Sequence, residues 1–152
     1  MKLGFIVIDK PAGVTSHDIV AMVRAVTGLK KVGHTGTLDP FATGVLPLAL
    51  GPATRLIQYL DESVKGYDAT IRFGQETDTG DPTGTVISTA PLPTCTREEI
   101  EQVLLDFTGE SMQTPPQYSA VKHKGKRLYQ YARKGETVKV DPRPITIHSI
   151  EL

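Results

Sequence analysis

The amino-acid sequence predicts an α+β fold in which helices flank a mixed or antiparallel sheet. Strand-like and helix-like segments follow one another without the regular strand–helix–strand units of parallel α/β folds. Two helix starts carry capping-box spacing, Thr15 with Asp18 and Thr96 with Glu99. With 152 residues and 39% hydrophobic content, the chain is long enough for one globular domain with its own core.

Apolar spacing predicts two strands and two helices in the first part of the chain. The continuous apolar run at residues 3–8 predicts a strand buried on both faces. Residues 16–27 predict a helix that ends at Gly28, and residues 45–50 predict a second core strand. A short helix is predicted at residues 53–60. The inward-facing residues predicted for the two helices are Ile19, Met22, Val23, Val26, Leu56, Ile57 and Leu60.

The remainder of the chain predicts further strands and one more helix. Residues 66–73 alternate with the period of a strand, and residues 85–89 and 143–152 predict two others. Residues 78–84 are dense in turn-forming residues. The helix follows the second capping box and is expected to end at Gly109. Its predicted inner stripe is Ile100, Val103, Leu104 and Phe107.

The loop at residues 33–48 combines three glycines and two prolines around a single carboxylate, Asp39. Glycines let another molecule approach the backbone closely, and Pro40 fixes the chain directly after Asp39. Such a loop presents its carboxylate to solvent. Taken alone, however, the loop favours a simpler interpretation, in which Asp39 bonds to its own backbone within a turn.

The formal net charge is zero, but basic residues are concentrated late in the chain. Residues 122–143 carry eight Lys and Arg against two acidic residues, whereas residues 1–121 carry nine against 14. Tyr118, Tyr129 and Tyr131 are interleaved with these cations. Aromatic faces for stacking and cations for phosphates are what a single-stranded nucleic-acid surface needs. The alternative is a solvated basic face that binds nothing.

Missing motifs argue against several common chemistries. Residues 33–37 lack the Gly-Lys-Ser/Thr ending of a P-loop, and no Gly-x-Ser-x-Gly elbow is present. The four histidines are not spaced as metal ligands, and Cys95 is the single cysteine. Glycosidases use two carboxylates, and the sequence offers no convincing second one to act with Asp39. No apolar run is long enough for a membrane span or a signal peptide, so we expect cytoplasmic residence.

Several ordered motifs together resemble one family. Residues 33–48 are similar to the catalytic motif of the tRNA pseudouridine-55 synthases, the TruB family, and residues 10–17 to that family's N-terminal motif. Lys65-Gly66-Tyr67 and residues 75–81 resemble two further segments of these enzymes. Residues 114–140 resemble the thumb with which they grip the T arm of tRNA. The thumb favours the bacterial stand-alone enzymes over their guide-RNA-dependent, dyskerin-like relatives.

The resemblance implies a reaction, a partner and a set of site residues. Uridine in the T loop of tRNA becomes pseudouridine, and the reaction needs neither a cofactor nor a metal ion. The implied partner is the T arm of tRNA, with no membrane and no protein partner. Asp39 falls on the essential aspartate of the family. His34, Tyr67 and Lys10 are implied to bind substrate: His34 inserts into the T loop, Tyr67 stacks on the flipped base, and Lys10 lies among the active-site loops. The implied RNA-binding residues are Lys122, Lys124, Lys126, Arg127 and Arg133.

Each of these roles has an ordinary structural alternative. His34 could be a turn histidine bonded to backbone, Tyr67 an aromatic of the core, and Lys10 a turn lysine or a support for the active-site loops. In the family, a second half of the catalytic domain follows, with an arginine that pairs with the aspartate, and then a C-terminal RNA-binding domain. We therefore expect residues 1–152 to be an N-terminal part of a pseudouridine synthase-like catalytic domain, with weak or no turnover alone. A non-catalytic tRNA-binding or folding module is the alternative function.

Overall fold

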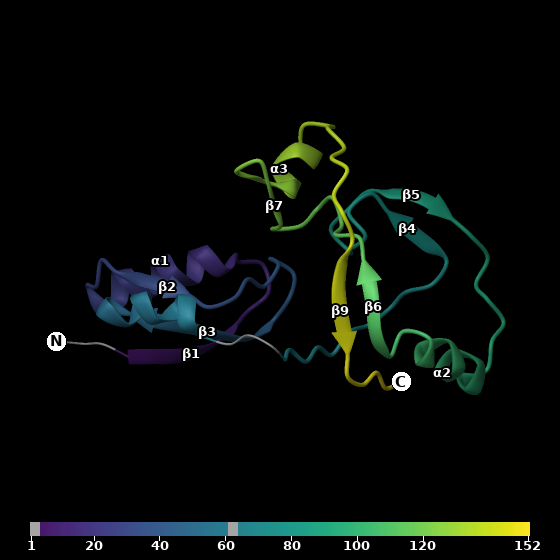
Figure 1. Ribbon diagram of the computed structural model, residues 1–152, viewed down its shortest axis with the longest axis horizontal. Coiled ribbons are helices and arrows are strands. Elements are labelled where there is room, and N and C mark those ends of the chain that lie inside the picture. Colours follow the sequence, from purple (N-terminus) through teal and green to yellow (C-terminus); the bar gives the residue numbers. More distant parts are fainter. Residues whose placement is uncertain (1–3, 61–63) are drawn as a thin grey trace. The chain divides into compact units, whose positions relative to one another are not determined.

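The computed structural model describes residues 4–60 and 64–152, and it divides the chain into two compact units (Figure 1). The units are Met1–Thr70 and Ile71–Leu152, and each is described by itself. Strands within the described residues pair antiparallel, and helices accompany them in both units. The α+β class is therefore confirmed. A single catalytic domain with residues 114–140 inserted into it stays a prediction.

The first unit contains a three-stranded antiparallel sheet in the order β1-β3-β2. Its strands are β1 (Gly4–Lys10), β3 (Gly44–Leu50) and β2 (Val32–His34). The two longer strands confirm the predicted ones, apart from residue 3, which lies outside the described residues. The short strand β2 was not predicted, because three residues are too few to show a period.

One face of this sheet packs against helix α1 (Ser16–Thr27) to form the core of the unit. The buried residues of that core are Ile19, Val20, Val32, Leu46 and Leu48. On the other face, Phe5 is 43% exposed and Val7 is 64% exposed, so the expected burial of the first strand on both faces is wrong. Successive side chains of a strand point to opposite faces, and α1 covers only one of them.

Helix α1 confirms the predicted start and end. Thr15 and Asp18 form the capping box, and Gly28 closes the helix in a left-handed conformation. Hydrogen bonds from the Thr15 hydroxyl and backbone hold the pKa of Asp18 below its usual value. The predicted inner stripe was partly wrong, because Met22 and Val26 are 53% and 88% exposed. The buried stripe instead runs through Ser16, Ile19, Val20 and Val23.

The predicted helix at residues 53–60 is a 3₁₀ helix, η1 (Gly51–Tyr59). Leu56 and Leu60, expected inside, are 50% and 41% exposed. Three residues per turn align Thr54 with Ile57, and these two side chains face Gly33 of the sheet. A Cβ at Gly33 would lie 3.1 Å from Cδ1 of Ile57, so the glycine permits this close approach.

The segment that contains the end of the first unit and the start of the second differs from the prediction. Residues 66–72 form no regular structure, so the strand expected at 66–73 is wrong. Its alternating pattern has no neighbouring strand to pair with among the described residues. Strand β4 (Gln75–Thr77) pairs instead with β5 (Val86–Thr89) across the turn-rich segment 78–84. The predicted turn and the predicted strand at residues 85–89 are confirmed.

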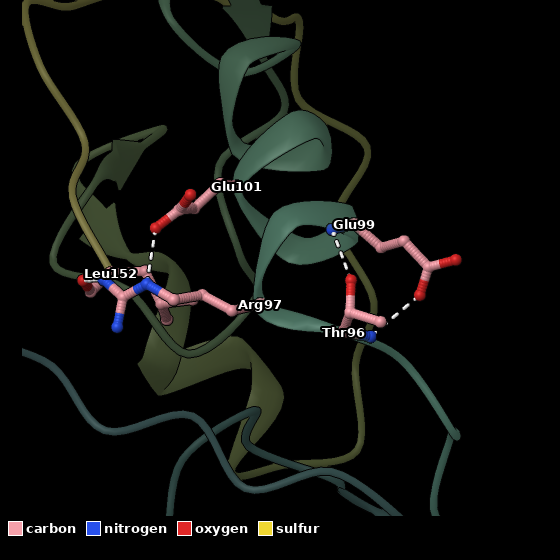
Figure 2. Close-up of polar contacts among 5 residues, drawn as sticks. All are labelled: Thr96, Arg97, Glu99, Glu101 and Leu152. Carbon is pink, nitrogen blue, oxygen red and sulfur yellow. Dashed lines mark hydrogen bonds and ion pairs between the residues drawn. The ribbon is translucent and has the colours of Figure 1, made fainter.

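Helix α2 (Arg97–Leu105) begins with the predicted capping box of Thr96 and Glu99 (Figure 2). Arg97 also pairs with Glu101 one turn along, with 2.6 Å between nitrogen and oxygen. The helix ends before Gly109, which instead begins the next strand. None of its residues is fully buried, and Val103 and Phe107 of the expected inner stripe are 55% and 56% exposed.

A further antiparallel pair of strands lies in the second unit. Strand β6 (Gly109–Gln113), which was not predicted, pairs with β9 (Arg143–Ile147). The strand expected at residues 143–152 is thus confirmed in its first half only. Within the described residues, no helix is both long enough and apolar enough to cross a membrane.

Residues 114–140, here called the thumb lobe, lie within the second unit, between β6 and β9. The lobe contains strands β7 (Lys122–His123) and β8 (Lys126–Arg127), which pair as a hairpin, and helix α3 (Leu128–Ala132). Leu128 is completely buried at its centre.

Candidate functional site

Asp39 lies at the start of a turn in the loop between β2 and β3. The backbone N–H of Ala42 donates a hydrogen bond to the carbonyl oxygen of Asp39 at 3.1 Å, with Pro40 second in the turn. The Asp39 side chain is exposed, and no described residue donates a hydrogen bond or forms an ion pair with its carboxylate. The structure therefore contradicts the alternative in which this carboxylate bonds to its own backbone.

The residue before Asp39 is held from both sides by one hydroxyl. Ser16, at the first turn of α1, accepts a hydrogen bond from the Leu38 backbone N–H at 2.9 Å. Its hydroxyl donates in return to the Leu38 carbonyl oxygen at 3.1 Å. Ser16 is only 2% exposed, so water does not compete for either bond. One backbone residue next to Asp39 is thereby fixed to a helix of the core.

The residue after Asp39 is tied to the N-terminal loop. The carbonyl oxygen of Pro40 accepts a hydrogen bond from the Gly13 backbone at 2.8 Å and from Nζ of Lys10 at 3.4 Å. The same ammonium donates to the carbonyls of Pro11 at 3.0 Å and Val14 at 2.8 Å. Lys10 is 0% exposed, and its three donors are directed at backbone carbonyls. This geometry fits support of the active-site loops, which was one alternative for Lys10, better than direct contact with substrate.

His34 is the last residue of β2 and lies opposite Leu48 of β3. Its side chain is half-buried, and strand alternation puts it on the same face as Val32, two residues earlier, which belongs to the core. The ring atom Nδ1 is buried and has no hydrogen-bond partner among the residues that the structure describes. Nδ1 therefore makes no hydrogen bond to the backbone of the described residues, as the alternative of a turn histidine would require.

Tyr67 lies outside any helix or strand and is 76% exposed. The alternative of an ordinary aromatic in the core is therefore wrong. Between the described residues, no hydrogen bond joins Tyr67 to the Asp39 loop. Lys10 and Asp39 are thus brought together through Pro40, whereas the place of Tyr67 in the site stays a prediction.

The thumb lobe presents its cations to solvent. The exposed basic side chains are Lys122, Lys124, Lys126, Arg127, Arg133, Lys134 and Lys139. Two of them cover aromatic faces of the same lobe: Nζ of Lys126 lies 5.9 Å from the centre of the Tyr131 ring, and Cζ of Arg133 lies 5.2 Å from that of Tyr129. These tyrosines therefore help to order the cations around them, in addition to any stacking on bases.

Two contributors to the geometry were missed in the sequence. Ser16 reads as part of a helix start, and only its place in the motif at residues 10–17 connects it to the Asp39 loop. Gln117 carries no sequence signal, yet its amide bonds to the backbone of Val138. For metal binding, the described residues contain no cluster of three or more His, Cys, Asp or Glu side chains.

Comparison with known proteins identifies close relatives. Residues 24–152 match the N-terminal domain of TruB family pseudouridylate synthases. The tRNA pseudouridine synthase B of Caldanaerobacter subterraneus subsp. tengcongensis is 50% identical over 149 residues, covering 98% of this chain and 52% of that protein. The protein of the same name from Trichormus variabilis is 53% identical over 149 residues, covering 98% and 50%. The chain spans about half the length of these curated relatives.

A solved structure also matches. One chain in the crystal structure of a Cbf5–Nop10–Gar1 complex superposes with a TM-score of 0.51 and 36% sequence identity. The match covers 78% of this chain and 31% of that one.

Proposed function

The chain belongs to the TruB family of pseudouridylate synthases, and we propose that the protein converts uridine to pseudouridine at position 55, in the T loop of tRNA. The reaction breaks the bond between N1 of the base and C1′ of the sugar and forms a bond between C5 and C1′. C5 loses its proton and N1 gains one, so the product is an isomer of the substrate. From the proposed tRNA substrate we also infer a cytoplasmic location.

Asp39 is the residue that starts this chemistry in our proposal. The supporting observation is that its carboxylate is exposed and without a partner among the described residues, while both neighbouring residues are tied down. A carboxylate fixed in this way loses little freedom when it meets a substrate. It attacks the sugar or the base, or removes the C2′ proton, and all three routes need it ionised.

His34 and Tyr67 are proposed to handle the flipped uridine. A base stacked in a folded T loop must leave its stack, which costs on the order of a few kcal/mol. His34 fills the space that the base leaves, and the exposed ring of Tyr67 stacks on the base itself. Lys10, by contrast, supports the loop that carries Asp39 without touching substrate.

The thumb lobe is proposed to supply the binding energy that offsets base flipping. Binding energy from parts of a substrate that do not react can stabilise a distorted reacting part. The exposed cations of the lobe are suited to the phosphates of the T arm. The implicated residues are Lys122, Lys124, Lys126, Arg127 and Arg133.

Tritium release from a T-arm stem-loop labelled at C5 of uridine tests the catalytic assignment. The comparison is between the full-length natural protein and its Asp39→Asn variant, which keeps the size of the side chain and removes its charge. We expect release to become undetectable in the variant while RNA binding persists. Full activity in Asp39→Asn would refute the role of Asp39.

The second candidate, a tRNA-binding or folding module without catalysis, is favoured by one observation. The thumb lobe is folded around its own buried residue, Leu128, and so does not depend on Asp39 for its structure. If the wild-type protein bound the stem-loop and promoted its folding without any tritium release, this second function would replace the first.

A further inference from the structure

The thumb lobe is closed at its base by one side-chain amide. Nε2 of Gln117 donates a hydrogen bond to the carbonyl oxygen of Val138 at 2.8 Å. Oε1 of the same amide accepts one from the Val138 N–H at 2.9 Å. Gln117 therefore occupies both backbone groups of a residue 21 positions away, as a paired strand would.

Three contacts beyond this closure fold the lobe onto itself. The Leu128 N–H donates to the carbonyl of Val121 at 2.8 Å, and the Tyr129 N–H donates to that of Ser119 at 3.1 Å. The hydroxyl of Tyr131 donates to the His123 carbonyl at 3.2 Å. These bonds hold α3 against the segment before it, but none of them reaches the returning segment that contains Val138.

We propose that Gln117 is a positioning residue for RNA binding, which holds the thumb lobe in its RNA-binding conformation before tRNA is bound. The two hydrogen bonds between Gln117 and Val138 are here called the latch. The proposal rests on the proposed function, because it assumes that the lobe binds the T arm. Gln117 carries no charge and is half-buried, so it acts through Val138 and not through a phosphate of its own. A segment that is ordered in advance loses less conformational freedom on binding and so binds more tightly.

Loss of the latch is expected to change RNA affinity and its salt dependence differently from loss of a charged contact. Removing a cation that touches phosphate weakens binding and also lowers the dependence of affinity on salt, because fewer counterions are released. Removing the latch leaves every cation in place. Affinity then falls at each salt concentration while the slope of log affinity against log salt stays unchanged.

Gln117→Met is the variant that tests this, because methionine has a similar length and makes neither hydrogen bond. We measure the Kd of the full-length natural protein for a T-arm stem-loop at four or more salt concentrations. Loss of two hydrogen bonds predicts affinity weaker by roughly five- to thirtyfold with the wild-type salt slope. Titration of concentrated protein with the stem-loop gives the fraction of protein that can bind RNA. A variant that is merely unfolded in part lowers this fraction, whereas Gln117→Met is expected to keep it.

Hydrogen exchange supplies an independent readout on the free protein. Protection of the Val138 amide is expected to fall in Gln117→Met, whereas the Leu128 amide, held by Val121, stays protected. Gln102→Met on the exposed face of α2 is the matched control and should change neither quantity. If Gln117→Met does not fold, Gln117→Asn replaces it, because its amide is one methylene too short to span both bonds.

The outcomes separate the two levels of the proposal. Wild-type affinity in Gln117→Met, or a flattened salt slope, overturns the latch and leaves the proposed function standing. A wild-type protein that does not bind the stem-loop overturns the proposed function, and the latch with it. Weaker binding at an unchanged slope, with a deprotected Val138 amide, supports the inference.

Discussion

Ser16 and Leu38 share two hydrogen bonds, although 22 residues separate them in the chain. The Ser16 hydroxyl accepts from the Leu38 N–H at 2.9 Å and donates to the Leu38 carbonyl at 3.1 Å. Because Leu38 directly precedes Asp39, the start of α1 sets where the proposed catalytic carboxylate lies. The loop is thus positioned from the core of its own unit.

Ser16→Ala is expected to lower the rate of pseudouridine formation more than it lowers RNA affinity. The substitution leaves the Leu38 N–H and carbonyl without their partner, which costs about 1–3 kcal/mol and loosens the position of Asp39. A misplacement of that kind reduces the single-turnover rate by roughly ten- to a hundredfold. Rapid-quench kinetics at saturating stem-loop RNA measure the rate.

Ser88→Ala, on the exposed strand β5, is the matched control and should keep the wild-type rate. Equal rates for Ser16→Ala and wild type would show that Asp39 is positioned without this hydroxyl.

Lys10→Met is expected to destabilise the protein. The substitution keeps most of the side-chain length but removes the donors that serve the carbonyls of Pro11, Val14 and Pro40. Loss of the buried ammonium leaves these carbonyl oxygens without their donor, which is expected to lower the free energy of unfolding by about 1–3 kcal/mol. Urea unfolding, followed by circular dichroism, gives the change. Lys30→Met at an exposed position is the control, and similar stability in both variants would contradict the supporting role of Lys10.

Local signals in the sequence were sufficient for the elements that local chemistry fixes. The capping box of Thr15 and Asp18 is contained within four neighbouring residues, and it starts α1 as predicted. The strand expected at 66–73 failed because a period-two pattern needs a partner strand, which local spacing does not reveal. The inward placing of Met22 failed for a related reason, since the packing of α1 on the sheet selects which side of the helix is buried.

The candidate site divides in the same way. Asp39 was identifiable because glycines and prolines surround a single carboxylate, and the family resemblance then gave it a role. The bonds of Ser16 to Leu38 and of Gln117 to Val138 join residues 22 and 21 positions apart. A serine or a glutamine has no period or motif that announces such a partner, so only the fold reveals these contacts.

Asp81 is expected to titrate below its usual range. Partial burial raises its pKa, but hydrogen bonds from Thr83, Thr79 and Gly84 outweigh that effect and hold the pKa below 3.8. Because the folded pKa is lowered, the stabilisation by this carboxylate is complete above about pH 3.8 and is lost as the pH falls further. The Thr83 N–H, which donates to Oδ1 of Asp81 at 2.8 Å, reports this locally.

The NMR shift of the Thr83 amide should therefore move with a midpoint below pH 3.8, and this transition should vanish in Asp81→Asn. A midpoint above that value in the wild-type protein would show that burial dominates over the hydrogen bonds.

Replacing the cations of the thumb lobe is expected to weaken RNA binding and to flatten its salt dependence. The variant changes Lys122, Lys124, Lys126 and Arg127 to alanine. Each phosphate contact that is lost lowers the slope of log affinity against log salt by about 0.7 to 0.9, depending on whether the RNA is single-stranded or paired. Fluorescence anisotropy with a T-arm stem-loop at several salt concentrations measures the slope.

The matched control for that variant conserves charge, with arginine at the three lysine positions and lysine at Arg127. It should keep the wild-type slope, because the number of released counterions is set by charge and not by side-chain shape. A slope that is equal in the alanine variant, the charge-conserving variant and the wild type would mean that these cations only face solvent. A slope lost in the alanine variant alone would place them on the phosphates, which is the arrangement that offsets the cost of flipping the uridine toward Asp39.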